Sequence, residues 1–563
     1  MDFRQAIAAA VAPHAAMSES DLNAVIEIPP NPQLGNFALP CFKLAKTMRK
    51  APAVIAAELM EKVTMPAFID HVDVAGGYLN FFVDNTVLAK DVLEAVLRLG
   101  ERYGSSGEGR GRCVCIDYSS INIAKPFHIG HLSTTVIGHA LYNIYNFLGY
   151  RSVGINHLGD WGTQFGKLIV AFLRWGDKDE IEHGGVAAML NIYVRFHEEA
   201  EKDPSLNEEA RAWFKKIEDG DEQALCLFHW FKELTLKEVD KVYKLLGIEF
   251  DSYAGESFYN DKMGRVIDEL KAKGLLVKDE GAWVVKFPEQ DNMPPCLLLK
   301  ADGATLYATR DIAAALYRKD TYDFYKCLYV VAYQQNLHFK QWFKVIEMMG
   351  YDWAKDLEHV AFGMVSLEGE TLSTRKGNVV FLKDVFHKAI EKTLAVINEK
   401  SPELPNKQEV AEKVGVGAIV FAALSSGRIK DITFSWERAL NFEGETGPYC
   451  QYTHARCCSV LSKASAPTKI DYSRLCDPQS QAVLKLLGEF PSAVLHAQAA
   501  NEPFYVTRHV IELCKAYNRL YFEHRILNAP PAERDARLAL TQATKTVIAT
   551  GLTLIGVAAP ERM

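Results

Sequence analysis

The stretch "CVCIDYSSINIAKPFHIGHLSTT", Cys113 to Thr135, sets the expectation for the fold. It opens with a short apolar run that is typical of a buried strand, and residues from about 129 to 148 have the periodicity of a helix. A buried strand that passes through a turn into a helix is how a doubly wound α/β sheet begins, and ligands bind beyond the carboxyl ends of such strands. The turn is therefore the first place to expect a site.

Two histidines occupy this turn. His128 and His131 are three residues apart, so they share a face if the helix begins here, at an N-terminus whose amides favour phosphate. Gly130 between them leaves a flat surface on which a nucleotide ring can lie. The alternative is a pair of ordinary surface or helix-cap histidines, and the four residues alone do not decide between the two.

A second motif begins at Thr371. The stretch "TLSTRKGNVVFL" places Arg375 and Lys376 on a loop rich in Ser, Thr and Gly, between "HVAFGMV" and a further apolar segment that we predict to be a strand. Cations there would neutralise charge that develops on a leaving pyrophosphate. A solvated surface loop is the alternative, but the two motifs in one chain favour a nucleotide site.

Length and composition limit the remaining possibilities. A chain of 563 residues predicts about three to five domains. A net charge of −8 provides no global attraction for polyanions, so a nucleic-acid partner must be held by local patches. The 11 cysteines form no CxxC pair, which predicts reduced thiols, a cytoplasmic location and no structural zinc. No secretory signal is found, and no apolar run approaches the roughly 18 residues that span a membrane.

Patterning along the chain predicts its elements. We expect an N-terminal α/β unit, then a linker, a sheet interrupted by a charged helical insertion, and a helical C-terminal third. The ranges are helices near 4–16 and over 40–62, a closing strand "GGYLNFFVD", a linker over 103–112, an insertion at about 189–246, a strand over 326–335, and only helical segments from about 406.

These motifs resemble a known family. "HIGH" and "LSTRKGN" resemble the HIGH and KMSKS signatures of class I aminoacyl-tRNA synthetases. "DYSSINIAKPFHIGHL", "NHLGDWGTQFGKL", "LYATRDIAAAL" and "GPYCQYTHAR" resemble the arginyl-tRNA synthetases. The resemblance implies a multidomain α/β protein with a Rossmann-type catalytic domain, a small N-terminal α/β domain and an all-α anticodon-binding domain of the DALR type. The implied domains are 1–108 (tRNA-contacting), 109–405 (catalytic), 406–445 (connecting helices) and 446–563 (anticodon-binding).

The resemblance also implies a reaction. The family ligates L-arginine to tRNA(Arg) with ATP and Mg²⁺ through an arginyl-adenylate, and releases pyrophosphate and AMP. The implied partners are tRNA(Arg), arginine and ATP, with no membrane, and a monomer is expected. No editing domain is expected, because a site that hydrogen-bonds a charged group already rejects analogues by roughly 10⁴–10⁵.

Site residues follow by position in the matching motifs. The implied catalytic residues are Lys125, His128, Gly130, His131, Ser373, Arg375 and Lys376. ATP binding is implied for Lys125, His128, Gly130, His131, Phe362, Gly363, Met364 and Ser373. Arginine binding is implied for Asp117, Ser120, Asn122, Tyr307, Asp311 and Gln335. Contacts to tRNA are implied for Asn36, Phe37, Tyr78, Tyr449, Tyr452, Arg456, Tyr517 and Arg519.

The arginine-binding set suits its ligand. A guanidinium is a planar cation with five donors, so its pocket must offer a carboxylate and hold no competing cation. Tyr307 and Asp311 are four apart and would share one helical face. The alternative for Asp311 is a structural salt bridge with Arg310 or Arg318.

Two positions depart from the family pattern. The five residues aligned with "KMSKS" run from Thr371 to Arg375 and contain neither usual lysine. Lys125, three residues before His128, is expected to supply the missing cation, because Coulomb stabilisation depends on distance and not on which segment carries the charge. Ser133 stands where the family commonly has arginine, and we have no physical account of this difference.

Three other functions stay open at this point. One is another class I synthetase, although a cysteinyl enzyme would need zinc ligands. Another is a small nucleotidyltransferase, although a pantothenate-type ligase would lack the helical C-terminal domain. The third is a synthetase-like protein that only binds tRNA.

Overall fold

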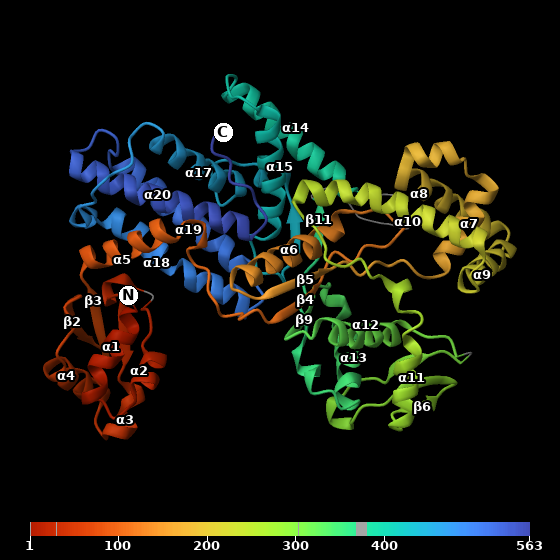
Figure 1. Cartoon of the computed structure of the whole chain (residues 1–563), viewed down its shortest axis with the longest axis horizontal. Helices are drawn as coiled ribbons and strands as arrows, with labels where there is room; N and C mark the ends of the chain where they lie inside the picture. The colour runs from red at the N-terminus through yellow and green to blue at the C-terminus, as the bar shows by residue number, and fades with distance from the viewer. Residues whose placement is uncertain (1, 30, 302, 368–379) are drawn as a thin grey trace. The chain divides into compact units, whose positions relative to one another are not determined.

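Figure 1 shows a computed structural model of the chain, which describes residues 2–29, 31–301, 303–367 and 380–563. The chain divides into two compact units, each assembled from three segments. The first comprises Met1–Tyr103, Ser459–Glu489 and Lys515–Val547, and the second comprises Gly104–Cys458, Phe490–Cys514 and Ile548–Met563. The C-terminal helices thus contribute to both units, which no sequence pattern predicted.

The N-terminal part of the first unit is a three-stranded antiparallel sheet with helices, as expected. The strand order is β1-β3-β2, and Phe3, Leu39 and Phe81 are buried in the core. The elements are α1 (Phe3–Val11), α2 (Glu19–Val25), β1 (Phe37–Pro40), α3 (Phe42–Met48), α4 (Pro52–Lys62), β2 (Ile69–Ala75), β3 (Tyr78–Val83) and α5 (Asn85–Leu99). Tyr103 connects this part to a later segment of the same unit, because its hydroxyl donates to the carbonyl of Leu487 at 3.0 Å.

Two helices predicted here are shorter than expected. The single helix predicted over 40–62 is two helices, because Arg49 ends α3 in the left-handed conformation and Pro52 starts α4. The helix predicted near 4–16 changes to a 3-10 turn where Pro13 removes a backbone donor.

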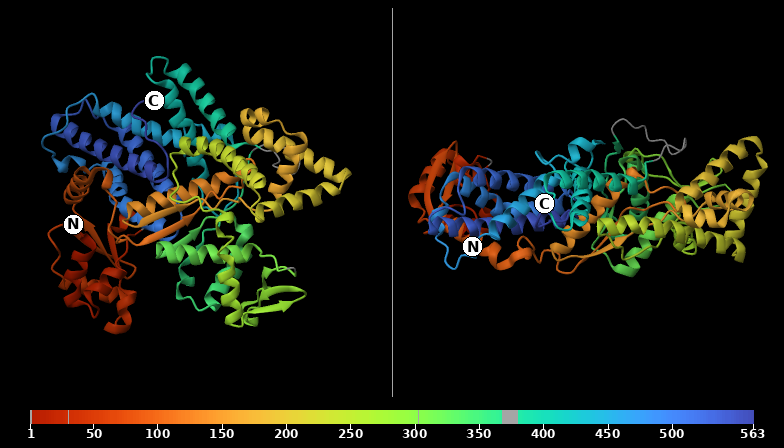
Figure 2. Two further views of the ribbon diagram at one scale, coloured as in Figure 1. Left: turned by 45° about the vertical axis from the view of Figure 1, so that its right-hand side comes forward. Right: turned by 90° about the horizontal axis from the view of Figure 1, so that it is seen from above.

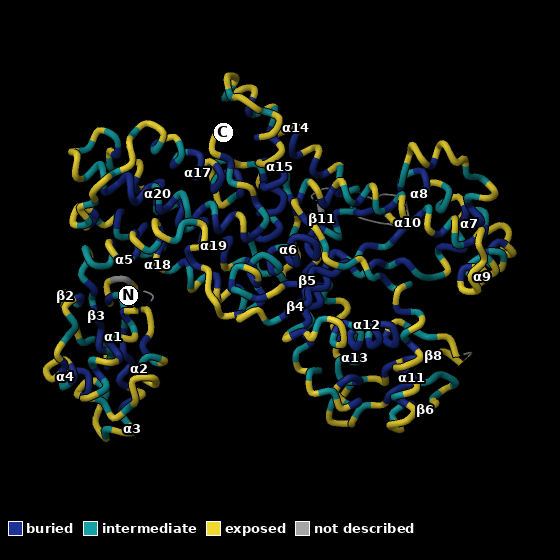
Figure 3. The backbone as a smooth tube through the Cα atoms, viewed as in Figure 1, coloured by how far each residue is buried: buried dark blue, intermediate teal, exposed yellow. Residues whose placement is uncertain are grey.

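The second unit is built on a four-stranded parallel sheet. The order is β10-β9-β4-β5. The strands are β4 (Cys113–Asp117), β5 (Arg151–Ile155), β9 (Lys326–Tyr329) and β10 (Leu357–His359). Every residue of β4 is buried, as expected for a central parallel strand covered on both faces (Figure 3). The flanking helices are α6 (Leu132–Phe147), α12 (Tyr307–Tyr322) and α13 (Asn336–Met348).

The strand order fixes where a ligand can bind. From β4 the chain moves outward to β5, then returns to the other side of β4 as β9. This reversal between β4 and β9 is a topological switch point, which leaves a crevice beyond the carboxyl ends of both strands. The strand predicted over 326–335 ends at Tyr329, and the chain continues into a 3-10 turn over Tyr333–Gln335.

A helical insertion joins β5 to the second half of the sheet. It comprises α7 (Thr163–Trp175), α8 (Lys178–Lys202), α9 (Ser205–Glu218) and α10 (Glu222–Leu246). Its helices form a bundle that is yellow in both views of Figure 2. The prediction of about 189–246 begins too late. One reason is that α8 is kinked at Gly185, whose φ of 58° interrupts the helical pattern.

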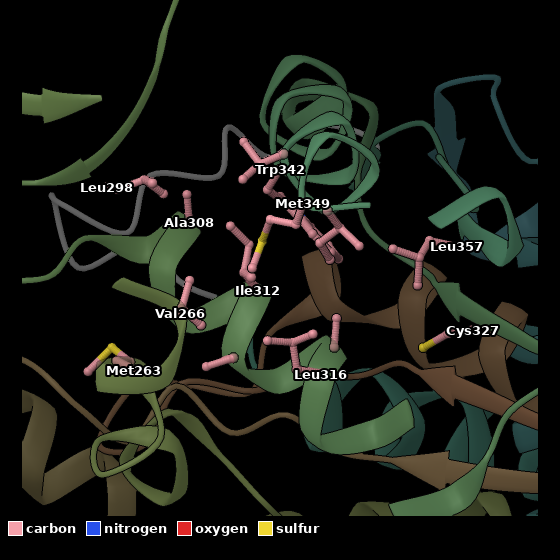
Figure 4. Close-up of a cluster of buried hydrophobic side chains, with 14 of the residues drawn as sticks. Met263, Val266, Leu298, Ala308, Ile312, Leu316, Cys327, Trp342, Met349 and Leu357 are labelled. Atoms are coloured by element: carbon pink, nitrogen blue, oxygen red, sulfur yellow. The ribbon is translucent and has the colours of Figure 1, made fainter. Parts of the chain in front are cut away.

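A three-stranded antiparallel sheet that the sequence did not predict follows the insertion. It consists of β6 (Leu276–Asp279), β7 (Ala282–Val285) and β8 (Cys296–Leu299), preceded by α11 (Met263–Ala272). Its side chains share one core with α12, α13 and the central sheet, where Ile312, Leu316 and Trp342 are buried (Figure 4). This packing holds α12, and with it Tyr307 and Asp311, against the sheet.

Helices dominate the remainder of the chain. They are α14 (Leu382–Lys400), α15 (Lys407–Ala423), α16 (Trp436–Ala439), α17 (Gly447–Leu461), α18 (Pro478–Ala499), α19 (Phe504–Glu523) and α20 (Pro531–Leu554). Two predictions are wrong in detail. β12 (Ile432–Phe434) lies in the region predicted to be purely helical and pairs in parallel with β11 (Val365–Leu367). The apolar segment predicted as a strand after the Thr371 loop instead starts α14 at Leu382.

Candidate active site

The two histidines form a closed backbone motif. A short 3-10 turn, Ile129–His131, starts at His128, whose Nδ1 accepts from the amide of Gly130 at 3.0 Å. Nδ1 of His131 lies 3.3 Å from both the amide nitrogen and the carbonyl oxygen of His128, so it accepts from the first or donates to the second depending on the tautomer. A neutral imidazole that accepts through Nδ1 carries its proton on Nε2. The ring of His128 can therefore donate a hydrogen bond through Nε2, which is the role expected toward a phosphate oxygen. The ring of His131 can do the same in the tautomer that accepts through Nδ1.

Burial keeps these rings neutral. Burial lowers the pKa of His128. Burial also lowers the pKa of His131, to about 3, and the neighbouring His128 adds to this effect. Gly130 is required by geometry, because a Cβ at this position would lie 2.7 Å from Cε1 of His128. Lys125 is exposed on the loop before the turn, and its charge also lowers the pKa of His131. A cation and two neutral donors thus occur within one short segment.

The chain around the second motif returns to the same turn. The amide of Ile129 donates to the carbonyl of Val380 at 3.2 Å, and the amide of Leu382 donates to the carbonyl of Phe127 at 2.8 Å. β11, on the other side of the motif, also contacts the turn. Ser373, Arg375 and Lys376 lie outside the described residues, but the residues that flank them, Leu367 and Val380, belong to segments beside the histidines.

The segment after β10 packs as a rigid backbone contact. Gly363 donates its amide to the carbonyl of Arg428 at 2.8 Å, and a Cβ there would lie 2.4 Å from the carbonyl of Lys430. Phe362 is buried, and Met364 is 42% exposed. This segment ends beside the switch point, because Phe362 bridges Ala332. The ATP-binding role expected for residues 362–364 stays a prediction.

A cavity of about 430 Å³ opens at the switch point. Five of the six expected arginine-binding residues line it, from β4, α12 and the turn after β9: Asp117, Ser120, Tyr307, Asp311 and Gln335. Asn122 is not among the lining residues. Its Oδ1 would lie 2.5 Å from a Cβ on Gly159, and the two residues form a bridge between the loops after β4 and β5.

Asp311 is the carboxylate that the pocket presents. Its Oδ2 is 2.6 Å from Nε2 of His338, and its side chain is partly exposed. The alternative partners Arg310 and Arg318 are engaged elsewhere, so neither structural salt bridge considered for Asp311 forms. Tyr307, one turn before Asp311 on α12, is 69% exposed.

The expectation that this pocket holds no cation is wrong. Arg318 lines the cavity and is almost completely buried, with Nη2 2.7 Å from Oδ2 of Asp117. Its charge is compensated by this carboxylate, so it does not repel a guanidinium as a free cation would. The other oxygen of Asp117 accepts from the hydroxyl of Ser120 at 2.7 Å. Asp117 therefore holds Arg318 and Ser120 in the lining of the pocket, with one oxygen for each.

A second carboxyl faces the same cavity. Burial raises the pKa of Glu256 to about 7, against the opposing effect of Arg310, whose Nη1 is 3.8 Å from it. Neighbouring Asp311 adds to the rise. A bound guanidinium would favour the ionised form of Glu256, so the pocket can become more acidic as a cationic ligand enters.

Sequence reasoning missed part of this lining. The missed residues with polar groups are His157, Glu256, Arg318, Tyr329, His338 and Trp342. His157 could have been found, because it lies two residues beyond the carboxyl end of β5, where ligand contacts are expected. Glu256 and Arg318 belong to no motif that we recognised and reach the cavity only through the fold.

The residues of the first unit that were expected to contact tRNA differ in how far their side chains are exposed. Tyr517 is fully buried, and its hydroxyl contacts that of Thr541 at 3.3 Å, so the prediction that it contacts RNA is wrong. Asn36 accepts from the amide of Val83 at 2.8 Å, and Phe37 and Tyr78 are half-buried on the same sheet. Phe81, the aromatic residue of the same sheet that pairs with Phe37 across β1 and β3, is in the core. Arg519 is exposed and pairs with Glu523 at 2.8 Å.

In the second unit, α17 presents an aromatic and basic face. Tyr452 is 42% exposed, and the guanidinium of Arg456 lies 5.0 Å from its ring centroid. Tyr449 is half-buried one turn earlier. Aromatic rings beside arginine are suited to stack on unpaired bases.

Among residues 2–29, 31–301, 303–367 and 380–563, no group of three or more His, Cys, Asp or Glu could hold a metal ion. Within the same residues, no helix is long and apolar enough to cross a membrane.

Comparison with known proteins decides the family. Residues 92–436 match the family described as tRNA synthetases class I (R), catalytic domain. The chain belongs to the arginyl-tRNA synthetase family. Residues 450–563 match the DALR anticodon binding domain, and residues 1–83 match the arginyl tRNA synthetase N terminal domain. The fold class predicted from the motifs is confirmed.

Individual members of the arginyl-tRNA synthetase family are similar over the whole chain. A protein of Alkaliphilus metalliredigens (strain QYMF) named arginine–tRNA ligase is 55% identical over 97% of both chains. A protein of Clostridium botulinum (strain Okra / Type B1) with the same name is 53% identical over 100% of both chains. The solved Thermus thermophilus arginyl-tRNA synthetase superposes with a TM-score of 0.83 at 25% identity over 100% of both chains.

Proposed function

We propose that this chain ligates L-arginine to tRNA(Arg) in two steps, with an arginyl-adenylate intermediate. The observation that carries the proposal is the cavity at the switch point. It presents Asp311 and Glu256 to a cationic ligand, in the same α/β fold that holds two neutral histidines at a helix N-terminus. The names of the full-length relatives support the same reaction.

The first step requires no side-chain nucleophile. The carboxylate of arginine attacks the α-phosphate of ATP in line, and pyrophosphate leaves; Mg²⁺ enters with ATP as part of the substrate. His128 and His131 donate Nε2–H to phosphate oxygens, and Gly130 supports the nucleotide. Lys125 places a positive charge near the triphosphate, a role that the family signature assigns to lysines that Thr371–Arg375 lack. Ser373, Arg375 and Lys376 are proposed as further contacts, so the rate comes from positioning and electrostatic stabilisation.

Recognition of arginine uses two of the three carboxyls that line the cavity. We assign the guanidinium to Asp311 and Glu256, with Tyr307 and Gln335 as additional partners. Ser120 and Asn122 are assigned to the α-amino and α-carboxylate groups. Asp117, which is held by Arg318, fixes Ser120 and does not contact the ligand as an independent anion.

The second step transfers arginine to tRNA. The 2′-hydroxyl of the terminal adenosine attacks the adenylate carbonyl, and AMP leaves. Tyr449, Tyr452 and Arg456 are proposed to contact the anticodon stem-loop, with Arg519 as a further phosphate contact. Asn36, Phe37 and Tyr78 are proposed to contact tRNA through the N-terminal domain. We also propose a cytoplasmic monomer with the domain limits given above.

The test is aminoacylation of unfractionated tRNA with each labelled amino acid in turn, by the wild-type chain and by Lys125→Ala. We expect transfer of arginine alone, and loss of most of the rate in Lys125→Ala. Transfer of another amino acid would identify a different class I synthetase. Binding of tRNA without any charging would identify a tRNA-binding relative and would overturn the proposal.

A further inference from the structure

Helix α10 of the insertion carries two polar side chains, one buried and one partly buried, that contact segments outside the helical bundle. Thr235 is completely buried, and its Oγ1 accepts from the amide of Ala124 at 3.1 Å while donating to the carbonyl of Phe231 at 2.8 Å. Ala124 has a φ of 58°, a left-handed backbone conformation that is unfavourable for a residue with a Cβ. The hydrogen bond from its amide to Thr235 helps to hold this conformation. The next residue is Lys125, so Thr235 fixes the backbone from which that lysine projects.

Glu238, one turn further along α10, holds a different segment. Its Oε1 is 2.8 Å from Nζ of Lys383, in the first turn of α14, and its Oε2 accepts from the amide of Val186 at 2.9 Å. The side chain of Glu238 is 18% exposed. Gly185 makes room for it, because a Cβ there would lie 2.7 Å from Oε2. The kink in α8 therefore exists where the carboxylate of Glu238 is seated.

The contact of Thr235 holds the segment before the histidine turn, and the contact of Glu238 holds a later segment that is hydrogen-bonded to the same turn. Ala124 precedes the turn. Lys383 follows directly on residues 380–382, which are hydrogen-bonded to Phe127 and Ile129, and its Nζ lies 5.1 Å from the ring centroid of Phe381. Tyr243, at the end of α10, adds a third contact, since its ring packs edge-on against Phe127 at 5.6 Å between centroids.

We propose that Thr235 and Glu238 are positioning residues for nucleotide binding. They set the distance between the segment that carries Lys125 and His128 and the segment that follows residues 368–379. Because Glu238 also holds the kink of α8, the arrangement of the insertion is coupled to the nucleotide site. This inference rests on the proposed function and goes beyond it, because neither side chain touches a substrate in the mechanism above.

The experiment measures arginine-dependent exchange of ATP with pyrophosphate, in the presence of tRNA, for Thr235→Val, Thr235→Ser, Glu238→Gln and Lys383→Met. We expect Thr235→Val and Glu238→Gln to raise KM for ATP and lower kcat, by roughly 10- to 100-fold in kcat/KM, as small displacements of reacting groups do. Thr235→Ser keeps the hydroxyl and should restore activity. The affinity for arginine alone, measured by calorimetry, should stay unchanged.

A matched control lies on the same helix. Glu233 pairs with Lys237 at 2.8 Å on the exposed face of α10, so Glu233→Gln removes an equivalent charge without reaching the histidine turn. The double variant of Glu238→Gln and Lys383→Met should lose no more activity than either single variant, because the two side chains act as one pair. Should Thr235→Val fail to fold, the Glu238 and Lys383 variants decide alone.

The outcomes separate the two proposals. If the wild-type chain shows no arginine-dependent exchange, the proposed function fails. If the wild-type chain is active but Glu238→Gln behaves as Glu233→Gln does, the positioning role is overturned and the function stands. Equal losses in arginine and ATP binding would indicate general destabilisation and would also overturn it.

Discussion

Arg318 and Asp117 form a buried ion pair in the lining of a cavity that we assign to a cationic substrate, with 2.7 Å between Nη2 and Oδ2. The pair resolves an apparent conflict, because a guanidinium of the protein lies near the place of a guanidinium of the substrate. Asp117 neutralises the first, and Asp311 and Glu256 remain for the second.

Removal of the buried cation should destabilise the fold. Arg318→Met leaves Asp117 buried without a counter-charge, which typically costs about 3–5 kcal/mol. Denaturant unfolding checks this, and Asp117→Asn combined with Arg318→Met should lose less stability than Arg318→Met alone. An Arg318→Met variant as stable as the wild type would show that Asp117 does not need the charge of Arg318 to be accommodated in the folded protein.

Asp311→Asn should weaken arginine binding much more than ATP binding. A hydrogen bond to a charged group is worth about 1.5–3 kcal/mol, so the affinity for arginine should fall by roughly 10- to 100-fold. Calorimetry with each ligand separately makes the comparison. Equal losses for the two ligands would indicate that Asp311 is structural, and His338→Asn would then show whether their 2.6 Å contact is the cause.

Arginine affinity should rise with pH through about 7. The pKa of Glu256 in the free protein is raised to about 7, mainly by burial, so this carboxyl is protonated below that value. A guanidinium favours the ionised form, so binding releases a proton below about pH 7 and is independent of pH above it. The affinity should therefore be lost as pH falls, by up to about tenfold per pH unit. Glu256→Gln should flatten this dependence, and a slope that persists in the variant would assign it to another group.

Gly130→Ala should impair ATP binding selectively. The added Cβ would lie 2.7 Å from Cε1 of His128 and would displace the ring that donates Nε2–H. We expect a higher KM for ATP in the exchange assay, with arginine affinity and melting temperature close to those of the wild type. A normal KM for ATP would mean that the position of His128 does not matter for the nucleotide.

Tyr452 and Tyr517 should differ in their effect on tRNA. A stacked base contributes about 1–3 kcal/mol, so Tyr452→Ala should weaken tRNA binding by roughly 10- to 100-fold in a filter-binding assay. Tyr517→Phe removes only a hydroxyl that is buried against Thr541, so tRNA affinity should be unchanged. An effect of Tyr517→Phe equal to that of Tyr452→Ala would return Tyr517 to the RNA interface.

Sequence patterns predicted correctly those helices and strands that are determined by residues close together in the chain. The buried strand before Asp117, the helix after His131 and the shared face of Tyr307 and Asp311 depend on residues a few positions apart, so periodicity and motif spacing suffice. Prediction failed where a proline or a left-handed residue broke a periodic segment, as at Pro52 and Arg49.

The sequence by itself determined the fold class, the turn that carries the two histidines and five of the residues that line the cavity at the switch point, because short-range patterns and motif strings carry them. Only the tertiary structure decided that Asp117 is neutralised by Arg318, that Asp311 contacts His338, and that burial brings the pKa of Glu256 close to neutrality. These properties depend on which strands are neighbours and on how much water is excluded. Both are set by packing between segments far apart in the chain, for which no local pattern exists.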